Sequence, residues 1–244
     1  MYDYALGGKD NFSVDREAVD AIMRQAPGAM QHAIENREFL RRAVLYVATE
    51  GVTQFIDIGC GLPTAENTHQ IAQRGNPHAR VAYADSDRLT VAHARALLAT
   101  DAETTVALEG DLREPDNILG SPEVRSLIDF SEPIAVVMVA VVHFLADPVA
   151  YDAVRYIRDT IPRGSFLVIS QGTADESSED ELETIRRTYR AAQSPLTMRS
   201  RGEFEQFFDG LDLVSPGVAS ITSWRNTVGT PDRTLSYGGV ARKP

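Results

Sequence analysis

Three acidic side chains, each beside an apolar run, are the groups of this sequence whose type and spacing could bind a ligand together. Asp57 stands two residues before a Gly59-Cys60-Gly61 turn, and Asp85 and Asp111 lie just past two later apolar runs. Glycine lets the backbone approach a ligand closely. A carboxylate that follows the second strand of a nucleotide-binding unit accepts hydrogen bonds from ribose hydroxyls. This order of glycine turn and acidic residues predicts a site for a nucleoside-containing molecule.

The elements that must position these carboxylates alternate between strands and helices. Short β-branched runs predict strands, and apolar residues at helical spacing predict helices. The predicted strands cover 54–58, 80–84, 105–109, 134–142 and 166–170, and the predicted helices cover 64–74, 89–98, about 124–128 and 147–161. Farther along, the pattern predicts helices over 182–192 and around 204–208 and strands over 211–221 and 235–241. Because parallel strands place their carboxyl ends at one edge of a sheet, we expect the three carboxylates to converge there.

The longest apolar run, 134–142, leads to His143 at the same expected edge. Such a run is typical of a central strand that is covered on both faces. Imidazole titrates near neutral pH, so His143 could take a proton from a substrate as a general base. The alternative is a structural role, in which the ring hydrogen-bonds a loop carbonyl group.

The segment before the first strand combines a glycine-rich start with two predicted helices. Residues 1–12 are rich in glycine and aromatic side chains, which fits either an anchored loop or a lid that closes over a ligand. A helix is predicted from Ser13, and a second helix carries an apolar face from Ile34 to Val47. Around that face, Arg37 could clamp a carboxylate near the glycine turn, whereas its polar neighbours are predicted to be solvated: Asn36, Arg41 and Arg42.

Composition narrows the class of partner. The 244 residues are 43% hydrophobic and 24% charged, which is ordinary for a globular α/β domain, and the net charge is −11. Such a charge argues against nucleic acid and against an anionic membrane, and therefore favours a small-molecule substrate. The lone cysteine, Cys60, excludes an internal disulfide and is expected to be a buried turn residue. No signal peptide or membrane-length apolar run is visible, so a cytoplasmic location is expected.

Taken together, these motifs resemble class I S-adenosylmethionine-dependent methyltransferases. More narrowly, the sequence is similar to the bacterial S-adenosyl methyltransferase family formerly described as a domain of unknown function, in the residues Tyr2–Phe12, Asn36-Arg37, Asp57–Thr64 and Val139–Phe144. The resemblance implies an α/β, Rossmann-like fold with a seven-stranded, mostly parallel sheet, one antiparallel strand, and helices on both faces. It also implies one methyltransferase domain over 1–244, with an N-terminal lid and helices at 1–48 and the core at 52–244.

The same resemblance implies the ligand and the site. The cofactor would be S-adenosyl-L-methionine, and the partner would be a small-molecule methyl acceptor. A role in secondary metabolism and a homodimer are both possible. No metal is expected. His143 would be the catalytic residue. Gly59 and Gly61 would approach the methionine part, Asp85 would bind the ribose, and Asp111 and Leu112 would recognise adenine. The full cofactor-binding set is Tyr4, Gly8, Asn11, Arg37, Asp57, Gly59, Gly61, Asp85, Ser86, Asp111, Leu112 and Ala140.

Three rival functions stay open on the sequence. A nicotinamide-dependent oxidoreductase uses the same βαβ unit, but its Gly-x-Gly-x-x-Gly turn would require glycine where Thr64 stands. A protein that senses S-adenosylmethionine without chemistry would have the same fold. An enzyme could also use this cofactor for a reaction other than methyl transfer.

Overall fold

The computed structural model describes residues 29–63, 66–98, 102–180, 182–183, 187, 196–226 and 234–244. The N-terminal motif with Tyr4, Gly8 and Asn11 and the helix predicted from Ser13 lie outside the described residues, as does most of the helix predicted over 182–192. Nothing about these predictions follows from the structure.

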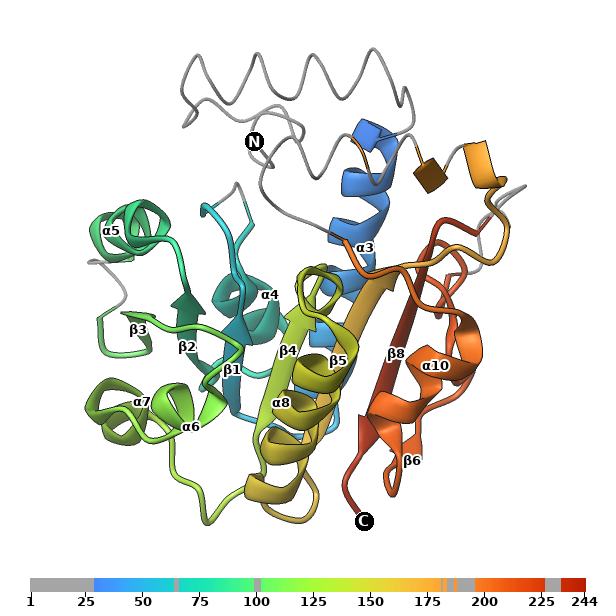
Figure 1. Ribbon diagram of the computed structural model, residues 1–244. Helices are drawn as coiled ribbons and strands as arrows, with labels where there is room; N and C mark the ends of the chain where they lie inside the picture. The colour runs from blue at the N-terminus through green and yellow to red at the C-terminus, as the bar shows by residue number, and fades with distance from the viewer. Residues whose placement is uncertain are drawn as a thin grey trace.

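A mixed sheet forms the centre of the molecule (Figure 1). Its main path runs in the order β3-β2-β1-β4-β5-β8-β6, and a further short strand, β7, pairs with β8. Strands β1 to β5 are parallel, whereas β8 runs antiparallel to β5, β6 and β7. The predicted, mostly parallel sheet with one reversed strand is therefore confirmed, and β7 adds an eighth strand. The bounds are β1 Gln54–Ile58, β2 Arg80–Asp85, β3 Thr105–Glu109, β4 Ala135–Val139, β5 Phe166–Gly172, β6 Asp212–Leu213, β7 Ala219–Ser220 and β8 Ser236–Arg242.

Helices cover both faces of the sheet, because successive strand residues point to opposite sides. Ile56 packs in one buried cluster with α6, α7 and α8, and Phe55 packs in the other with α3, α4 and α5. Figure 1 shows α8 in front of β4 and β5 and α3 behind the sheet. The described helices are α3 Ala29–Thr49, α4 Thr68–Gly75, α5 Arg88–Leu97, α6 Pro115–Leu119, α7 Pro122–Leu127, α8 Asp147–Thr160 and α10 Arg201–Glu205, with 3-10 turns η2 Val142–Phe144 and η3 Gln206–Phe208.

Several predicted boundaries near the carboxyl edge are wrong. The run 134–142 forms a strand only as far as Val139, because Ala140 has a left-handed backbone with φ 58° that ends the extended chain. The helix predicted from residue 64 begins at Thr68, where Asn67 and Gln70 form a capping box.

The C-terminal prediction over 211–221 is also wrong in detail. That stretch contains two short strands, β6 and β7, separated by Pro216 and Gly217. Proline has no N–H to donate to a strand ladder, and Gly217 turns the chain at φ 82°. The antiparallel pairing along 235–241 is confirmed as β8.

Helix α3 confirms its predicted apolar face but corrects three of its residues. Ile34 is 41% exposed, although the spacing placed it on the buried face. Asn36, expected to face solvent, is buried and accepts a hydrogen bond from Ser170 of β5. Arg42 donates from Nε to the carbonyl of Trp224 at 2.9 Å and so anchors α3 to the C-terminal segment. Only Arg41 keeps the predicted solvated character, in an exposed ion pair with Glu38.

Candidate active site

The glycine turn after β1 is bonded directly to the end of β2. The Gly61 N–H donates to Asp85 Oδ2 at 2.9 Å, and the Gly59 N–H donates to the carbonyl of Ala84 at 2.8 Å. The other carboxylate oxygen of Asp85 accepts the Asp87 N–H at 3.0 Å. Burial raises the pKa of Asp85, while these backbone donors act in the opposite direction. Asp85 is therefore held in one orientation beside the turn.

The two glycines of the turn meet different surroundings. Both have left-handed backbones, with φ 73° at Gly59 and φ 66° at Gly61. A Cβ atom at Gly59 would lie 2.6 Å from Val141 Cγ2, so this position is closed by the loop after β4. At Gly61 a Cβ atom would meet no atom of the described residues within 4 Å. The open space over Gly61 is therefore available to a ligand.

A cavity of about 370 Å³ opens at the carboxyl ends of β1, β2 and β3. This volume lies within the range of small-molecule sites, which is roughly 300 to 1,000 Å³. Four predicted cofactor residues line it, namely Gly59, Ser86, Asp111 and Leu112. The remaining lining residues are Ile58, Gly110, Arg113, Val141, Phe144 and Leu145. The cavity combines apolar walls with a carboxylate on its rim.

Asp111 is paired within this rim. Arg113 donates from Nε to both Asp111 oxygens at 2.9 Å, and this hydrogen bonding lowers the pKa of Asp111. The pair is partly exposed to solvent. The carboxylate is therefore ionised at neutral pH and keeps lone pairs for a further donor such as an adenine amino group.

A second group of predicted residues surrounds a much smaller hollow of about 10 Å³, which is lined by Arg37, Asp57 and Gly61 among others. Thr68 Oγ1 donates to Asp57 Oδ2 at 2.6 Å. Arg37 contacts the carbonyl of Glu66 through Nη2. The structure thus brings Arg37 beside the glycine turn as predicted.

Asp57 ionises with difficulty in this position. Burial raises its pKa to about 6, against the Thr68 hydrogen bond and the charge of Arg37, which lower it. The folded protein therefore binds a proton at Asp57 more tightly than the unfolded chain does between about pH 4 and pH 6. The stability contributed by this group is lost as pH rises through that window.

An Asp57→Asn variant is expected to flatten this pH dependence. Relative to the variant, the wild type should lose about 2 to 3 kcal/mol of unfolding free energy between pH 4 and pH 7, because the pKa difference is worth about 3 kcal/mol in full and part of it is already lost at pH 4. Chemical denaturation at a series of pH values measures this. Glu109→Gln is the matched control, because Glu109 is an exposed carboxylate at the same sheet edge. Parallel curves for wild type and Asp57→Asn would contradict the assignment.

Cys60 lies within the same turn. Burial, with the charges of Asp57 and Asp85, raises the pKa of its thiol well above the ordinary value. The thiol therefore stays protonated at neutral pH and is a poor nucleophile. Cys60 is thus a turn residue as expected, although its side chain is only partly buried.

The backbone at Ala140 is fixed by a buried polar chain that the sequence analysis missed. The Ala140 N–H donates to both the carbonyl and Oγ of Ser170 at 3.1 Å, and Ser170 Oγ donates to Asn36 Oδ1 at 2.6 Å. Positive φ at a non-glycine residue is uncommon and is often found at functional sites. Ala140, predicted to bind the cofactor, thus stands where β4 turns into the cavity wall.

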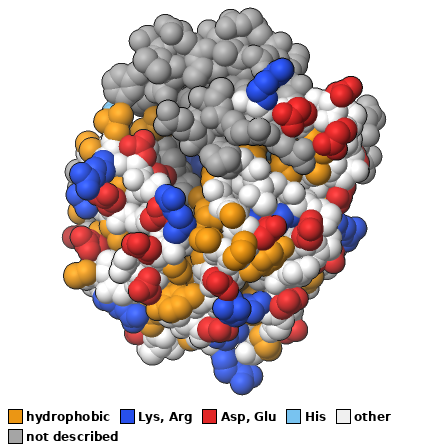
Figure 2. Space-filling view, in the orientation of Figure 1, with side chains coloured by type: hydrophobic (Ala, Val, Ile, Leu, Met, Phe, Trp, Pro, Cys, Tyr) orange, Lys and Arg blue, Asp and Glu red, His pale blue; other side chains and the backbone are white. Residues whose placement is uncertain are grey.

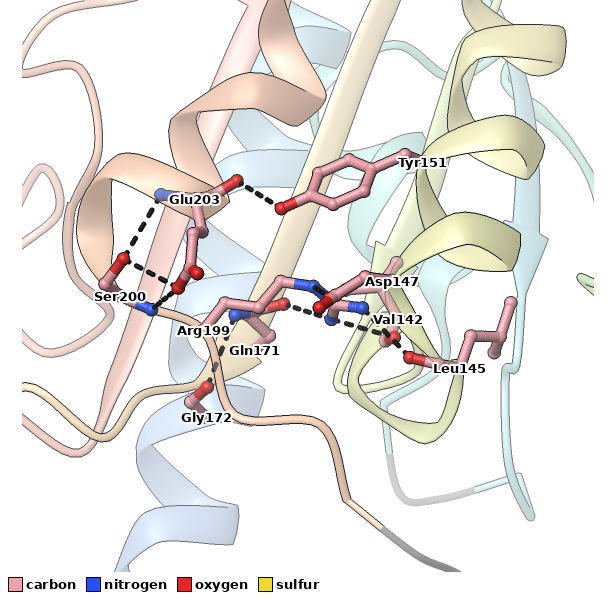
Figure 3. Close-up of polar contacts among 9 residues, drawn as sticks. All are labelled: Val142, Leu145, Asp147, Tyr151, Gln171, Gly172, Arg199, Ser200 and Glu203. Atoms are coloured by element: carbon pink, nitrogen blue, oxygen red, sulfur yellow. Dashed lines mark hydrogen bonds and ion pairs between the residues drawn. The ribbon is translucent and has the colours of Figure 1, made fainter.

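Arg199 is a second residue that the sequence analysis missed (Figure 3). It is 1% exposed and donates to the carboxylate of Asp147, to Gln171 Oε1 and to the carbonyls of Val142 and Leu145 at 2.8 to 3.3 Å. These contacts hold the loop after β4 against the end of β5. No motif marks Arg199 in the sequence, because all its partners are distant along the chain.

His143 lies in η2, four residues after the end of β4. Its Nδ1 accepts the Gly172 N–H at 3.3 Å, so its partner is a backbone amide and not a loop carbonyl. Burial lowers the pKa of His143 to about 3, and the charges of His32 and Arg199 act in the same direction. The ring is therefore neutral at physiological pH. Its catalytic role stays a prediction.

The sheet order and the reversed strand β8 are those of the Rossmann-like fold of class I methyltransferases. Residues 1–244 match the family model of the S-adenosyl methyltransferases. The chain belongs to that family: it is a methyltransferase that uses S-adenosyl-L-methionine. A comparison with curated protein sequences found no match.

Solved structures agree with this assignment. A DUF574 family protein of Streptomyces avermitilis MA-4680 is 40% identical with a TM-score of 0.93, over 100% of this chain and 95% of that chain. A protein of Thermobifida fusca YX, provisionally described as a methyltransferase, is 39% identical with a TM-score of 0.93, over 99% and 92%. The N-methyltransferase NodS of Bradyrhizobium japonicum WM9, in complex with S-adenosyl-L-homocysteine, is 12% identical with a TM-score of 0.51, over 84% and 85%. This last likeness concerns the fold alone.

Proposed function

We propose that this methyltransferase acts on a small-molecule acceptor and binds its cofactor across the carboxyl ends of β1, β2 and β3. The adenosine part would occupy the cavity beside Ser86, Asp111 and Leu112, with the ribose hydroxyls on Asp85. The methionine part would lie over Gly61, toward Arg37 and Asp57. The observation that carries this placement is the hydrogen bond from the Gly61 N–H to Asp85, because it fixes the glycine turn and the acidic residue next to each other.

The chemistry asked of the protein is chiefly positioning. Bound S-adenosylmethionine supplies an electrophilic methyl group on a sulfonium. The protein must then hold the acceptor in line with that group and exclude water. Ala140 and His143 follow β4, next to the strands that would hold the cofactor, so we assign the acceptor to this side and His143 to its immediate surroundings.

Charge supports a small acceptor. The chain carries a net charge of −11. On the face shown in Figure 2, basic side chains are interspersed with acidic ones. Such a surface gives little nonspecific attraction to nucleic acid. No described helix has the length and apolar character needed to cross a membrane.

Four further parts of the proposal rest on the sequence. We propose a single domain over 1–244, in which 1–48 supplies a lid and helices and 52–244 the core, with Tyr4, Gly8 and Asn11 reaching the cofactor. A cytoplasmic location is the second part, and a homodimer the third. A role in secondary metabolism is the fourth. Among structures with this fold is mitomycin 7-O-methyltransferase MmcR, which is 18% identical with a TM-score of 0.54 over 91% of this chain and 60% of that chain.

An extract-labelling experiment tests the proposed acceptor class. Purified protein is incubated with methyl-labelled S-adenosylmethionine and a metabolite extract that still contains protein and nucleic acid. Label should appear in the small-molecule fraction, and the Asp85→Ala variant should reduce it strongly. Label confined to protein or nucleic acid would overturn the small-molecule assignment.

A further inference from the structure

Two histidines bind the same rung of the β5–β8 ladder. Gly172 and Ser236 are register partners at the end of that ladder. The Gly172 N–H donates to His143 Nδ1 at 3.3 Å, and Ser236 Oγ lies 3.1 Å from His32 Nε2. The rings come from different elements, His32 from α3 and His143 from η2. The shared rung therefore places both imidazoles at the carboxyl edge of β5, near enough for the charge of His32 to lower the pKa of His143.

Each ring has one nitrogen left for a ligand. Because His143 Nδ1 accepts a hydrogen bond, a neutral His143 carries its proton on Nε2 and can only donate there. His32 Nδ1 is buried and makes no hydrogen bond. Buried polar atoms are paired in the large majority of cases, and an exception requires an explanation. An acceptor group seated between the two rings would satisfy both nitrogens.

The position of the pair suits the methyl acceptor. Most of the predicted cofactor contacts lie at the ends of β1, β2 and β3, whereas Ala140 follows β4, and β5 lies beyond β4 in the same sheet. Ala140 N–H bonds Ser170 on β5, so the end of β4 is fixed against the strand that carries Gly172. An acceptor at the two rings would therefore lie beside the methionine end of the cofactor.

We propose that His32 and His143 form a clamp for the acceptor's hydroxyl group, with His143 Nε2–H donating to the hydroxyl oxygen and His32 Nδ1 accepting its proton. This inference rests on the proposed function. It gives His32, which the sequence analysis did not single out, the role of base. His143 acts as a hydrogen-bond donor that orients the oxygen, in place of the base expected from the sequence.

The proton transfer balances in atoms and charge. The hydroxyl O–H bond breaks and its proton moves to His32 Nδ1. The electron pair of the oxygen forms the new bond to the methyl group, while the pair of the broken S–CH3 bond stays on sulfur. His32 thus gains a positive charge as the sulfonium loses one, so the total charge in the site does not change.

The low basicity of His32 restricts the acceptor to a phenol or a similarly acidic hydroxyl. Burial lowers the pKa of His32, and this makes it a weak base. A weak base can assist only a hydroxyl that gives up its proton readily, such as a phenol with a pKa of about 10. Aliphatic alcohols are far less acidic.

Nitrogen-15 NMR of the histidine rings in the full-length protein tests the clamp. The chain has 5 histidines, and exposed His78 serves as an internal control. Saturation with S-adenosylhomocysteine is first established by calorimetry. Phenol and anisole are then titrated as probes, because anisole is the methyl ether of phenol and lacks the hydroxyl proton.

We expect phenol to shift the His32 Nδ1 resonance in a saturable way and anisole to bind at least tenfold more weakly. The His78 resonances should not change, and His143 should carry its proton on Nε2. His32→Gln should weaken phenol binding by about tenfold, the usual effect of one lost hydrogen bond. Equal responses to phenol and anisole in the wild type, or a His143 proton on Nδ1, would overturn the clamp even if the variant failed to fold. Failure of S-adenosylhomocysteine to bind would instead reject the proposed function, and the clamp with it.

Discussion

Replacing Asp85 by alanine is expected to weaken binding of S-adenosylmethionine by thirty- to a hundredfold, or about 2 to 3 kcal/mol. The variant would lose the proposed hydrogen bonds from the Asp85 carboxylate to two ribose hydroxyls. It would also release the Gly61 N–H and the Asp87 N–H, so the glycine turn would lose its fixed orientation. Isothermal titration calorimetry measures the affinity.

Glu109→Ala is the matched control for this change. Glu109 is the register partner of Asp85 in the β2–β3 ladder and is exposed, with its carboxylate paired to Arg88 at 3.0 Å. Its removal alters the charge at the same edge without touching the turn, so affinity should stay within about twofold of the wild type, as for other surface changes. A folded Asp85→Ala protein that binds the cofactor like the control would contradict the assigned ribose contact.

Replacing Arg199 by methionine is expected to lower the free energy of unfolding by about 2 to 6 kcal/mol. The change leaves two buried acceptors without their donor, Leu145 O and Gln171 Oε1, at about 1 to 3 kcal/mol each. It also removes a cation from beside the rings of Tyr151 and Phe207. Cofactor affinity should fall as well, because Leu145 lines the 370 Å³ cavity.

Arg155→Met is the control for Arg199, and denaturant titration is the measurement. Arg155 forms an ion pair with Asp152 at 2.7 Å, but both side chains are more than half exposed. Exposed pairs contribute roughly 0 to 1 kcal/mol, so this variant should unfold almost like the wild type. Similar losses in the two variants would show that Arg199 does not brace the loop.

The parts of the fold that follow from local pattern were predictable. Phe55, Ile56 and Ile58 lie in a short apolar run before a glycine turn, and they form β1 as expected. The placement of Gly61 and Asp85 at one edge of the sheet was also implied by their order, since consecutive parallel strands end at one edge. These features depend on residues that are close in sequence or joined by a single crossover.

The parts that depend on distant contacts were not predictable. The run 134–142 reads as one strand, but Ala140 is held in a left-handed conformation by Ser170, which is 30 residues away. Asn36 reads as a surface residue on its helix and is buried because its partner comes from β5. The two imidazoles meet through a ladder rung, and neither His32 nor His143 signals the other in the sequence. Contacts between polar residues of distant strands and helices leave no periodic pattern in the local sequence, so they could not be predicted from it.

The central claim is that S-adenosylmethionine lies across the carboxyl ends of β1, β2 and β3, and hydrogen–deuterium exchange with bound S-adenosylhomocysteine tests it most directly. We predict slower exchange at Gly59–Gly61, at Asp85–Asp87 and at Gly110–Arg113. The lid proposal adds slower exchange at residues 1–12. Residues 50–53, at the opposite edge of the sheet, should exchange at an unchanged rate. Protection confined to the opposite edge, or no protection at a saturating concentration confirmed by calorimetry, would contradict the account.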